Sequence, residues 1–282
     1  MPKKVFLPVA IIIILSFVFT LLLGGCTAKE TDKLKVVAST SLIASIVERV
    51  GGDKVAVVNI IPPAQCPGHF DVKPGDVQQL ADAAIFLLHG WQGEMFSDDL
   101  IASANNPELA VFRLDIQGNW MTPQVQAEAI GRIAGILGQL DADNAPVYQK
   151  AATELASMVE AKGAEIKANL DKLNLSSINV LCDEQQAGFV KWAGFNIIAT
   201  FGRPETFTPQ VVKDLVDKDR TGKVTLVIDN MQTGGESGKS LAEELGVKHI
   251  VLSNFPGGFE NTETWEKAID KNIELLLVVI AR

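Results

Sequence analysis

Cysteines and basic residues are scarce in this chain, and each scarcity excludes a class of protein. The 282 residues include only three cysteines, too few for a disulfide scaffold. Lysine and arginine together number 25 against 34 aspartates and glutamates, a net charge of −9. No basic surface is therefore available to neutralise phosphates, and we expect no nucleic-acid partner. A 47% hydrophobic share excludes a disordered chain, and the length suits two domains of ordinary size.

A long apolar run stands at the N-terminus, over residues 5–23, preceded by Lys3 and Lys4. This order is typical of a secretory signal, and the Leu-Gly-Gly that precedes Cys26 resembles a bacterial lipoprotein signal in which that cysteine is lipidated. An uncleaved membrane anchor is the alternative. We expect a signal peptide at 1–25, a polar tether at 26–33, and a mature chain outside the cytoplasm, anchored to the cell membrane by its N-terminal lipid.

The rest of the chain alternates strands with helices, which predicts parallel sheets covered on both faces. We expect a first α/β lobe at 34–140 and a second at 175–282. In the first, strands are predicted at 34–39, 55–61, 84–88 and near 111, with helices at 42–50, 76–83, 93–103 and 122–140. In the second, strands are predicted at 178–182, 196–201, 224–229 and 249–252, with helices between them and a last helix from about 262.

The segment 141–174 predicts one long helix between the lobes. Asn144 can cap it, Pro146 suits its first turn, and apolar residues recur at helical spacing up to residue 173, with Gly163 as the only weak point. The fold class is therefore α/β: two lobes joined by one long backbone helix, with a ligand cleft between them at the carboxyl ends of the strands.

Metal-capable side chains follow several of these strands. Cys66-Pro67-Gly68-His69 has the Pro-Gly centre of a type II turn, which would bring a thiolate and an imidazole within reach of one ion. His89 follows the strand at 84–88. The second lobe offers three more candidates at the end of its first strand, namely Cys182, Asp183 and Glu184. His249, away from the cleft, is given no function.

Sulfur and nitrogen ligands suit zinc best, with copper and iron as alternatives, and disfavour manganese, which prefers oxygen. Other interpretations stay open at this stage. A Cys66–Cys182 disulfide would leave a metal few soft ligands. Arg203 would suit an anionic ligand, or could form a surface ion pair with Glu205. The stretch 230–240 imitates a phosphate-binding loop, but Thr233 stands where that motif needs glycine.

The mature chain resembles a known family, the metal-binding solute-binding lipoproteins of ABC importers that carry zinc or manganese. The stretches that carry the resemblance are 34–40, 50–53, 60–76, 120–123 and 140–148. It implies two α/β lobes on one stiff helix, an ABC permease as partner, no enzymatic activity, and a transition metal ion as transported ligand. We expect a monomer.

The positions at which the family has its ligands differ in this chain. Cys66-Pro67-Gly68 stands where the family has Asp-Pro-His, Gly118 replaces a second histidine, and Ser253 stands near the last acidic ligand. Only Asp183 matches by type. The resemblance therefore implies the fold and the transport role more firmly than the metal, and a metal chelate or small anion is an alternative cargo.

A surface adhesion module is a further alternative. An enzyme with Cys66 as nucleophile and His69 as base is the weakest, because no third orienting group is apparent.

Overall fold

The computed structural model describes residues 33–91 and 94–280, and the residues from Leu34 onward form one compact unit. The predicted signal peptide, Cys26 and nearly all of the tether lie outside the described residues. Within the described ranges, no helix combines the length and the apolar character needed to cross a bilayer.

The first lobe is built on a parallel sheet with the strand order β2-β1-β3-β4. Its third strand in chain order, β3, is buried at every residue, as expected for a strand covered on both faces. Alternate side chains point to opposite faces: Phe86 packs toward α3 and α4, and Leu87 toward the core that contains α2 and α5. The elements are β1 (Leu34–Ala38), α2 (Ser41–Gly51), β2 (Val55–Asn59), α3 (Pro74–Ala81), β3 (Ile85–Leu88), α4 (Phe96–Ala104), β4 (Ala110–Arg113) and α5 (Pro123–Leu140).

The second lobe repeats this plan with the strand order β6-β5-β7-β8, again all parallel. Leu181 and Val227 face a cluster formed with α8 and α9, and their neighbours in sequence face the opposite core. The elements are β5 (Asn179–Asp183), α7 (Ala187–Ala193), β6 (Asn196–Phe201), α8 (Pro209–Gly222), β7 (Leu226–Asn230), α9 (Ser237–Leu245), β8 (Lys248–Leu252) and α10 (Trp265–Ile280).

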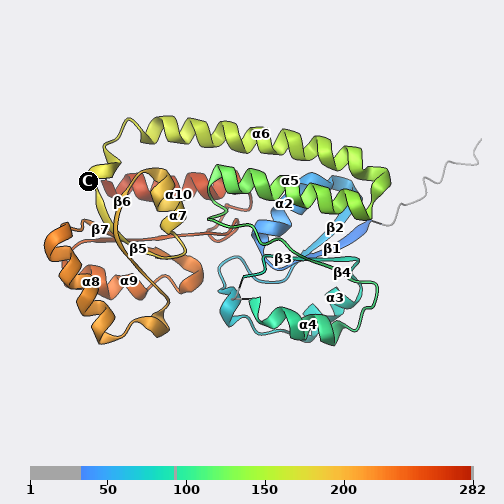
Figure 1. The fold of residues 1–282 in the computed structure, drawn as a ribbon, viewed down its shortest axis with the longest axis horizontal. Coiled ribbons are helices and arrows are strands. Elements are labelled where there is room, and N and C mark those ends of the chain that lie inside the picture. The colour runs from blue at the N-terminus through green and yellow to red at the C-terminus, as the bar shows by residue number, and fades with distance from the viewer. Residues whose placement is uncertain (1–32, 92–93, 281–282) are drawn as a thin grey trace, which may run out of the picture. The chain divides into compact units, whose positions relative to one another are not determined.

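The long helix α6 (Ala145–Leu170) runs along both lobes, as Figure 1 shows. Its 26 residues give a length of about 39 Å at 1.5 Å per residue. The buried face of α6 belongs to one core that includes residues of both sheets. Pro146 occupies the first turn, as predicted. Asn144 stands at the N-cap position, as predicted, but its side chain makes no capping bond and donates to Asp141 Oδ2 at 2.8 Å instead.

The start of the last helix also differs from the prediction. The helix begins at Trp265 rather than near Thr262, because Thr262 belongs to the preceding loop. Its hydroxyl accepts a hydrogen bond from the Phe259 N–H, and its carbonyl accepts one from the Gly257 N–H. A residue whose polar groups close a loop in this way is not free to begin the helix.

Three contacts tie the lobes together on the side of α2 and α10. Arg49 Nη1 donates to both carboxylate oxygens of Glu266, at 2.6 and 2.8 Å. The Trp265 indole donates to the Trp120 carbonyl at 3.2 Å, and the Ser41 hydroxyl to the Pro256 carbonyl at 2.7 Å. Together with α6, these contacts fix one side of the boundary between the lobes.

Candidate ligand-binding cleft

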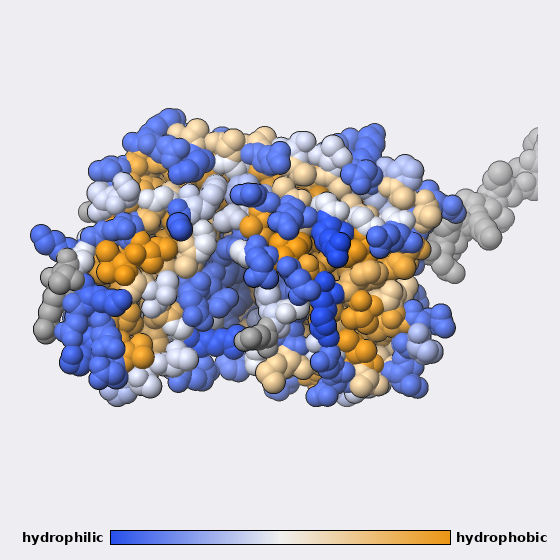
Figure 2. Space-filling model, viewed as in Figure 1, coloured by the Kyte–Doolittle hydropathy of each residue, from blue (hydrophilic) through white to orange (hydrophobic). Residues whose placement is uncertain are grey.

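A cleft of about 840 Å³ lies between the lobes, lined by residues of both lobes. Figure 2 shows it as a hollow whose walls are largely hydrophilic. Besides three aromatic side chains, the lining includes Cys66, Gly68, Gln117, Gly118, Asn119, Glu184, Gln185, Arg203, Asn230, Gln232, Thr233 and Asn254.

The strand order explains why these residues meet. In each sheet the chain leaves the first strand in one direction and later returns to its other side, so the loops after the central strands diverge and leave a crevice. Glu184 and Gln185 follow β5, Gln232 and Thr233 follow β7, and Asn254 follows β8. The carboxyl ends of both sheets thereby form the two walls of one cleft.

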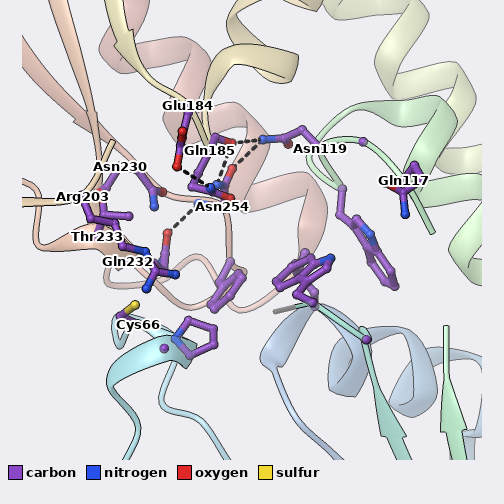
Figure 3. A pocket seen from close by; sticks show the side chains of 18 of the residues that line it. Cys66, Gln117, Asn119, Glu184, Gln185, Arg203, Asn230, Gln232, Thr233 and Asn254 are labelled. Atoms are coloured by element: carbon purple, nitrogen blue, oxygen red, sulfur yellow. Dashed lines mark hydrogen bonds between the residues drawn. The ribbon is translucent and has the colours of Figure 1, made fainter. Parts of the chain in front are cut away.

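Amide side chains hold the cleft together from wall to wall. Asn119 Nδ2 of the first lobe donates to the Gln185 carbonyl and to Asn254 Oδ1, both at 2.8 Å. Gln232 Nε2 crosses in the other direction to the Pro63 carbonyl, also at 2.8 Å. Figure 3 shows Asn119, Gln185 and Asn254 converging on one another. These hydrogen bonds between amide groups of the two lobes hold the walls of the cleft in position.

Charged groups of both signs reach the cleft. Glu184 and Arg203 both line it and come from neighbouring strands, β5 and β6. Within the described residues, the Arg203 guanidinium has no hydrogen-bond or ion-pair partner. The pairing with Glu205 that the sequence left open does not occur, because Glu205 lies 3.3 Å from His69 Nε2 at the surface. Arg203 instead lies against Gly68 across the cleft, and a Cβ on Gly68 would meet its Nη1 at 2.4 Å.

Aromatic side chains from both lobes form part of the cleft wall. Trp91, Trp120 and Phe255 line it, and the rings of Trp91 and Phe255 lie within 15° of parallel with their centroids 6.5 Å apart. His89 stacks behind Trp91 at 3.6 Å. The cleft therefore offers flat apolar surfaces beside its polar groups.

The structure does not assemble the six predicted metal ligands. Among residues 33–91 and 94–280, no three histidine, cysteine, aspartate or glutamate side chains are grouped so that they could hold a metal ion. Of the six, Cys66 and Glu184 line the cleft, whereas His69, His89, Cys182 and Asp183 do not.

The loop at 66–69 folds differently from the predicted type II turn. The His69 N–H does donate to the Cys66 carbonyl at 3.1 Å, but Pro67–His69 form a 3₁₀ turn and Gly68 has no positive φ. Cys66 faces the cleft, and His69 points away to Glu205. The thiol and the imidazole therefore do not converge on one ion.

The other candidates are occupied by structural contacts. His89 is 1% exposed, its Nε2 lies 2.8 Å from Thr40 Oγ1, and burial lowers the pKa of its imidazole well below the ordinary value. Cys182 is buried in the core, and this burial raises the pKa of its thiol to about 12.

Asp183 lies behind the cleft wall. Its Oδ1 accepts the Gln185 N–H at 2.7 Å and its Oδ2 accepts the Thr233 hydroxyl at 2.7 Å. Burial outweighs these hydrogen bonds and raises the pKa of Asp183 to about 6. The remaining positions that the resemblance singled out offer no metal ligand either. Gly118 has no side chain, and the Ser253 hydroxyl donates to the Phe255 carbonyl at 2.9 Å.

Two open questions from the sequence are also answered. Cys66 and Cys182 are both free, so the structure contains no disulfide between them. The stretch that imitates a phosphate loop contributes Gln232 and Thr233 to the cleft wall, held by the bonds described above. His249 lies away from the cleft, 2.7 Å from Asp229 Oδ2.

Sequence reasoning missed the amides that line the cleft. Their signal was present, because Gln185, Asn230, Gln232 and Asn254 all follow or end predicted strands of the second lobe. Amides are weak ligands for zinc, so their positions after these strands did not indicate a metal site.

Two parallel sheets on one long helix, with a polar cleft at their carboxyl ends, define a two-lobed solute-binding protein. Residues 36–277 match the family model of ZnuA, the periplasmic component A of a zinc-uptake complex. The chain belongs to this family, which consists of transport proteins and not of enzymes.

Curated relatives are similar over nearly their whole length. The metal ABC transporter substrate-binding lipoprotein SsaB of Streptococcus sanguinis is 23% identical, with 95% of this chain and 99% of that protein covered. The manganese ABC transporter substrate-binding lipoprotein PsaA of Streptococcus pneumoniae is 22% identical, with 82% and 84% covered.

Solved structures share the fold. FpvC of Pseudomonas aeruginosa, determined with a Ni²⁺ ion, superposes with a TM-score of 0.76 at 20% identity, covering 89% of this chain and 97% of that one. The laminin-binding protein Lmb of Streptococcus agalactiae, described as having adhesin and metal-transporting activity, superposes with a TM-score of 0.74 at 20% identity, covering 88% and 99%.

Proposed function

We propose that this chain is the substrate-binding component of an ABC importer, and that it captures a transition-metal cargo in the cleft between its lobes. The observation that carries the proposal is that this cleft stands at the carboxyl ends of both parallel sheets in a chain of the zinc-uptake family. A permease in the cytoplasmic membrane would receive the cargo. The relatives named above are lipoproteins of such importers.

We propose an extracytoplasmic location, with the chain held to the cell membrane by a lipid on Cys26 and acting as a monomer. The basic residues, apolar run and Leu-Gly-Gly-Cys order at the N-terminus support this part of the proposal.

Zinc is the favoured metal, with copper and iron next and manganese last. Cys66 and Glu184 are the proposed protein contacts, because they are the two predicted ligands on the cleft wall. A thiol and a carboxylate together suit zinc better than manganese, which prefers oxygen donors throughout.

A cleft-filling substitution tests the proposal. The chain from Thr27 to Arg282, which contains the whole compact unit, would be stripped of metal and titrated with zinc salts and zinc citrate. A ligand at 100 times its Kd stabilises the native state by about 2.7 kcal/mol, or a Tm shift of roughly 5–10 °C for a chain of this size.

Gln117→Trp, in an exposed residue of the cleft lining, should abolish the Tm shift. Gln149→Trp makes the same change on the exposed face of α6 and should leave it intact. A Tm shift of equal size in both variants would place the cargo outside the cleft and contradict the proposal.

The structure does not favour surface adhesion as a second function. The large apolar side chains that are exposed in the described part of the chain are spread over several elements, with Val147 and Met158 on α6 and Val72, Leu140 and Val278 elsewhere. Scattered single residues of this kind are normal for a soluble domain.

A further inference from the structure

The side chains that the cleft offers to a ligand do not suit a bare metal ion. A bare transition metal ion needs several ligand atoms from side chains around one point, usually four for zinc. Within the described residues, no three metal-ligating side chains are grouped around one point. Asp183, the position that matches the family by residue type, is buried behind Thr233. The residues present therefore do not fit a naked ion.

Two side chains of the second-lobe wall, Arg203 and Asn230, have hydrogen-bond donors that are free among the described residues. Arg203 has no partner among the described residues, although its guanidinium carries five N–H groups and lines the cleft. Asn230 is 1% exposed, and its side-chain oxygen accepts from Gln186 Nε2 at 3.0 Å. Its NH₂ group has no partner in the part of the chain that the structure describes. Donors of this kind bind oxygen anions, not metal cations.

Arg203 lies close to Gly68 of the first lobe. The guanidinium lies against the backbone of Gly68, where any Cβ would overlap Nη1 at 2.4 Å. The cation therefore lies between the two lobes, where a ligand in the cleft would meet it. In Figure 3, Arg203 and Asn230 lie on the same wall, with Cys66 nearby.

The size and the walls of the cleft also suit an organic ligand. Its volume of about 840 Å³ lies in the range of small-molecule pockets, roughly 300–1,000 Å³. A single water molecule, by comparison, takes up about 30 Å³ of liquid volume. The nearly parallel rings of Trp91 and Phe255 offer apolar contact to a carbon skeleton.

We propose that the cleft binds a transition metal already enclosed in a small organic chelator that bears carboxylates. Arg203 receives a free carboxylate of the chelator through paired N–H···O bonds, and Asn230 donates to a second oxygen. Cys66 and Glu184 lie where they can contact the metal or the chelator. This inference rests on the proposed function and names the form in which the metal arrives.

The test compares four probes on the metal-free chain from Thr27 to Arg282: zinc citrate, ferric citrate, citrate alone and Zn²⁺ alone. Binding is followed by calorimetry and by the fluorescence of the cleft tryptophans. We expect one chelate per chain, bound at least about tenfold more tightly than Zn²⁺ or citrate alone.

Arg203→Gln should weaken chelate binding about tenfold or more, since hydrogen bonds to a charged group are worth about 1.5–3 kcal/mol. Arg203→Lys should recover only part of it.

Glu205→Gln is the matched control, two residues away and in contact with His69 outside the cleft. It should change the Kd less than about twofold. Tight binding of Zn²⁺ alone that Arg203→Gln leaves unchanged would overturn the chelate inference and leave the proposed function standing. Citrate binding as tightly without metal would overturn it in favour of an organic anion. If neither the chelates nor free zinc bind, both the inference and the proposed function fail.

Discussion

Gly163 of α6 lies directly against Pro123 at the start of α5. A Cβ on Gly163 would meet Pro123 Cγ at 2.2 Å, a separation that no packed side chain tolerates. The glycine that looked like a weak point in the long helix is therefore a place where α5 and α6 approach closely. Since both helices contribute to the core shared by the lobes, this contact supports the shape of the whole cleft.

We expect Gly163→Ala to destabilise the protein by about 1–3 kcal/mol, because the helices must separate to admit the methyl group. Gly131→Ala on α5 is the matched control, since that glycine is exposed and has no atom within 4 Å of the added Cβ. The control should be stabilised by up to about 1 kcal/mol through helix propensity alone. Urea unfolding of both variants measures the difference. Equal gains in stability would show that the helices do not touch at Gly163.

His89 should make stability depend on pH. Burial lowers the pKa of its imidazole in the folded state, so below about pH 6.5 the unfolded chain binds a proton that the folded chain does not. The free energy of unfolding is therefore unaffected by protonation of His89 above that pH. It decreases as the pH falls below it, by up to about 1.4 kcal/mol per pH unit.

His89→Gln should lower stability at pH 7, because the stack on Trp91 is lost, and should flatten the decline between pH 6.5 and 5. Leu87→Ala on the same strand lowers stability without removing the imidazole and should keep the decline. Urea midpoints at several pH values compare the three proteins. An unchanged slope in His89→Gln would assign the pH dependence to other groups.

The two cysteines of the described chain should react at different rates with a thiol reagent. In the chain from Thr27, Cys66 is 9% exposed at the cleft wall and should react with the native protein. Cys182 should react only after unfolding, because it is buried and its thiol pKa is raised to about 12. One fast and one slow equivalent at pH 8 is the expected count. No reactive thiol in the non-reduced protein would instead indicate a disulfide.

Replacement of these cysteines by serine should separate binding from stability. Cys66→Ser should weaken binding of zinc citrate by about tenfold or more and leave the Tm nearly unchanged, if the thiol contacts the metal. Cys182→Ser places a hydroxyl in the apolar core and should cost about 1–3 kcal/mol of stability while leaving the Kd unchanged. An unchanged Kd in Cys66→Ser would remove this residue from the site.

Cys26→Ala tests the lipid anchor. Expressed with its own signal in a bacterium, the natural chain should incorporate labelled palmitate and sediment with membranes. The variant should incorporate none. Cys66→Ser is the control that keeps the lipoprotein motif and should still be labelled. Labelling of the Cys26→Ala protein would place the lipid elsewhere.

The sequence determined the fold because its evidence is local and repeated. Alternating apolar strands and amphipathic helices predicted two parallel sheets, and a run of helical spacing with Pro146 in its first turn predicted α6 close to its observed bounds. The capping role of Asn144 failed because that side chain bonds to Asp141, a choice between two nearby partners that spacing does not decide.

The site was decided only by the tertiary structure. Residue type placed Cys182 and Cys66 in the same ligand set, but Cys182 turns from β5 into the core, whereas Cys66, 9% exposed, stands in the loop after β2 and lines the cleft. Arg203 was left between a surface ion pair and an anion site, and only the close approach of Gly68 from the other lobe resolved it. The sequence by itself therefore fixed what is local, the strands, the helices and the family. Contacts between residues more than a hundred positions apart decided which side chains a ligand can reach.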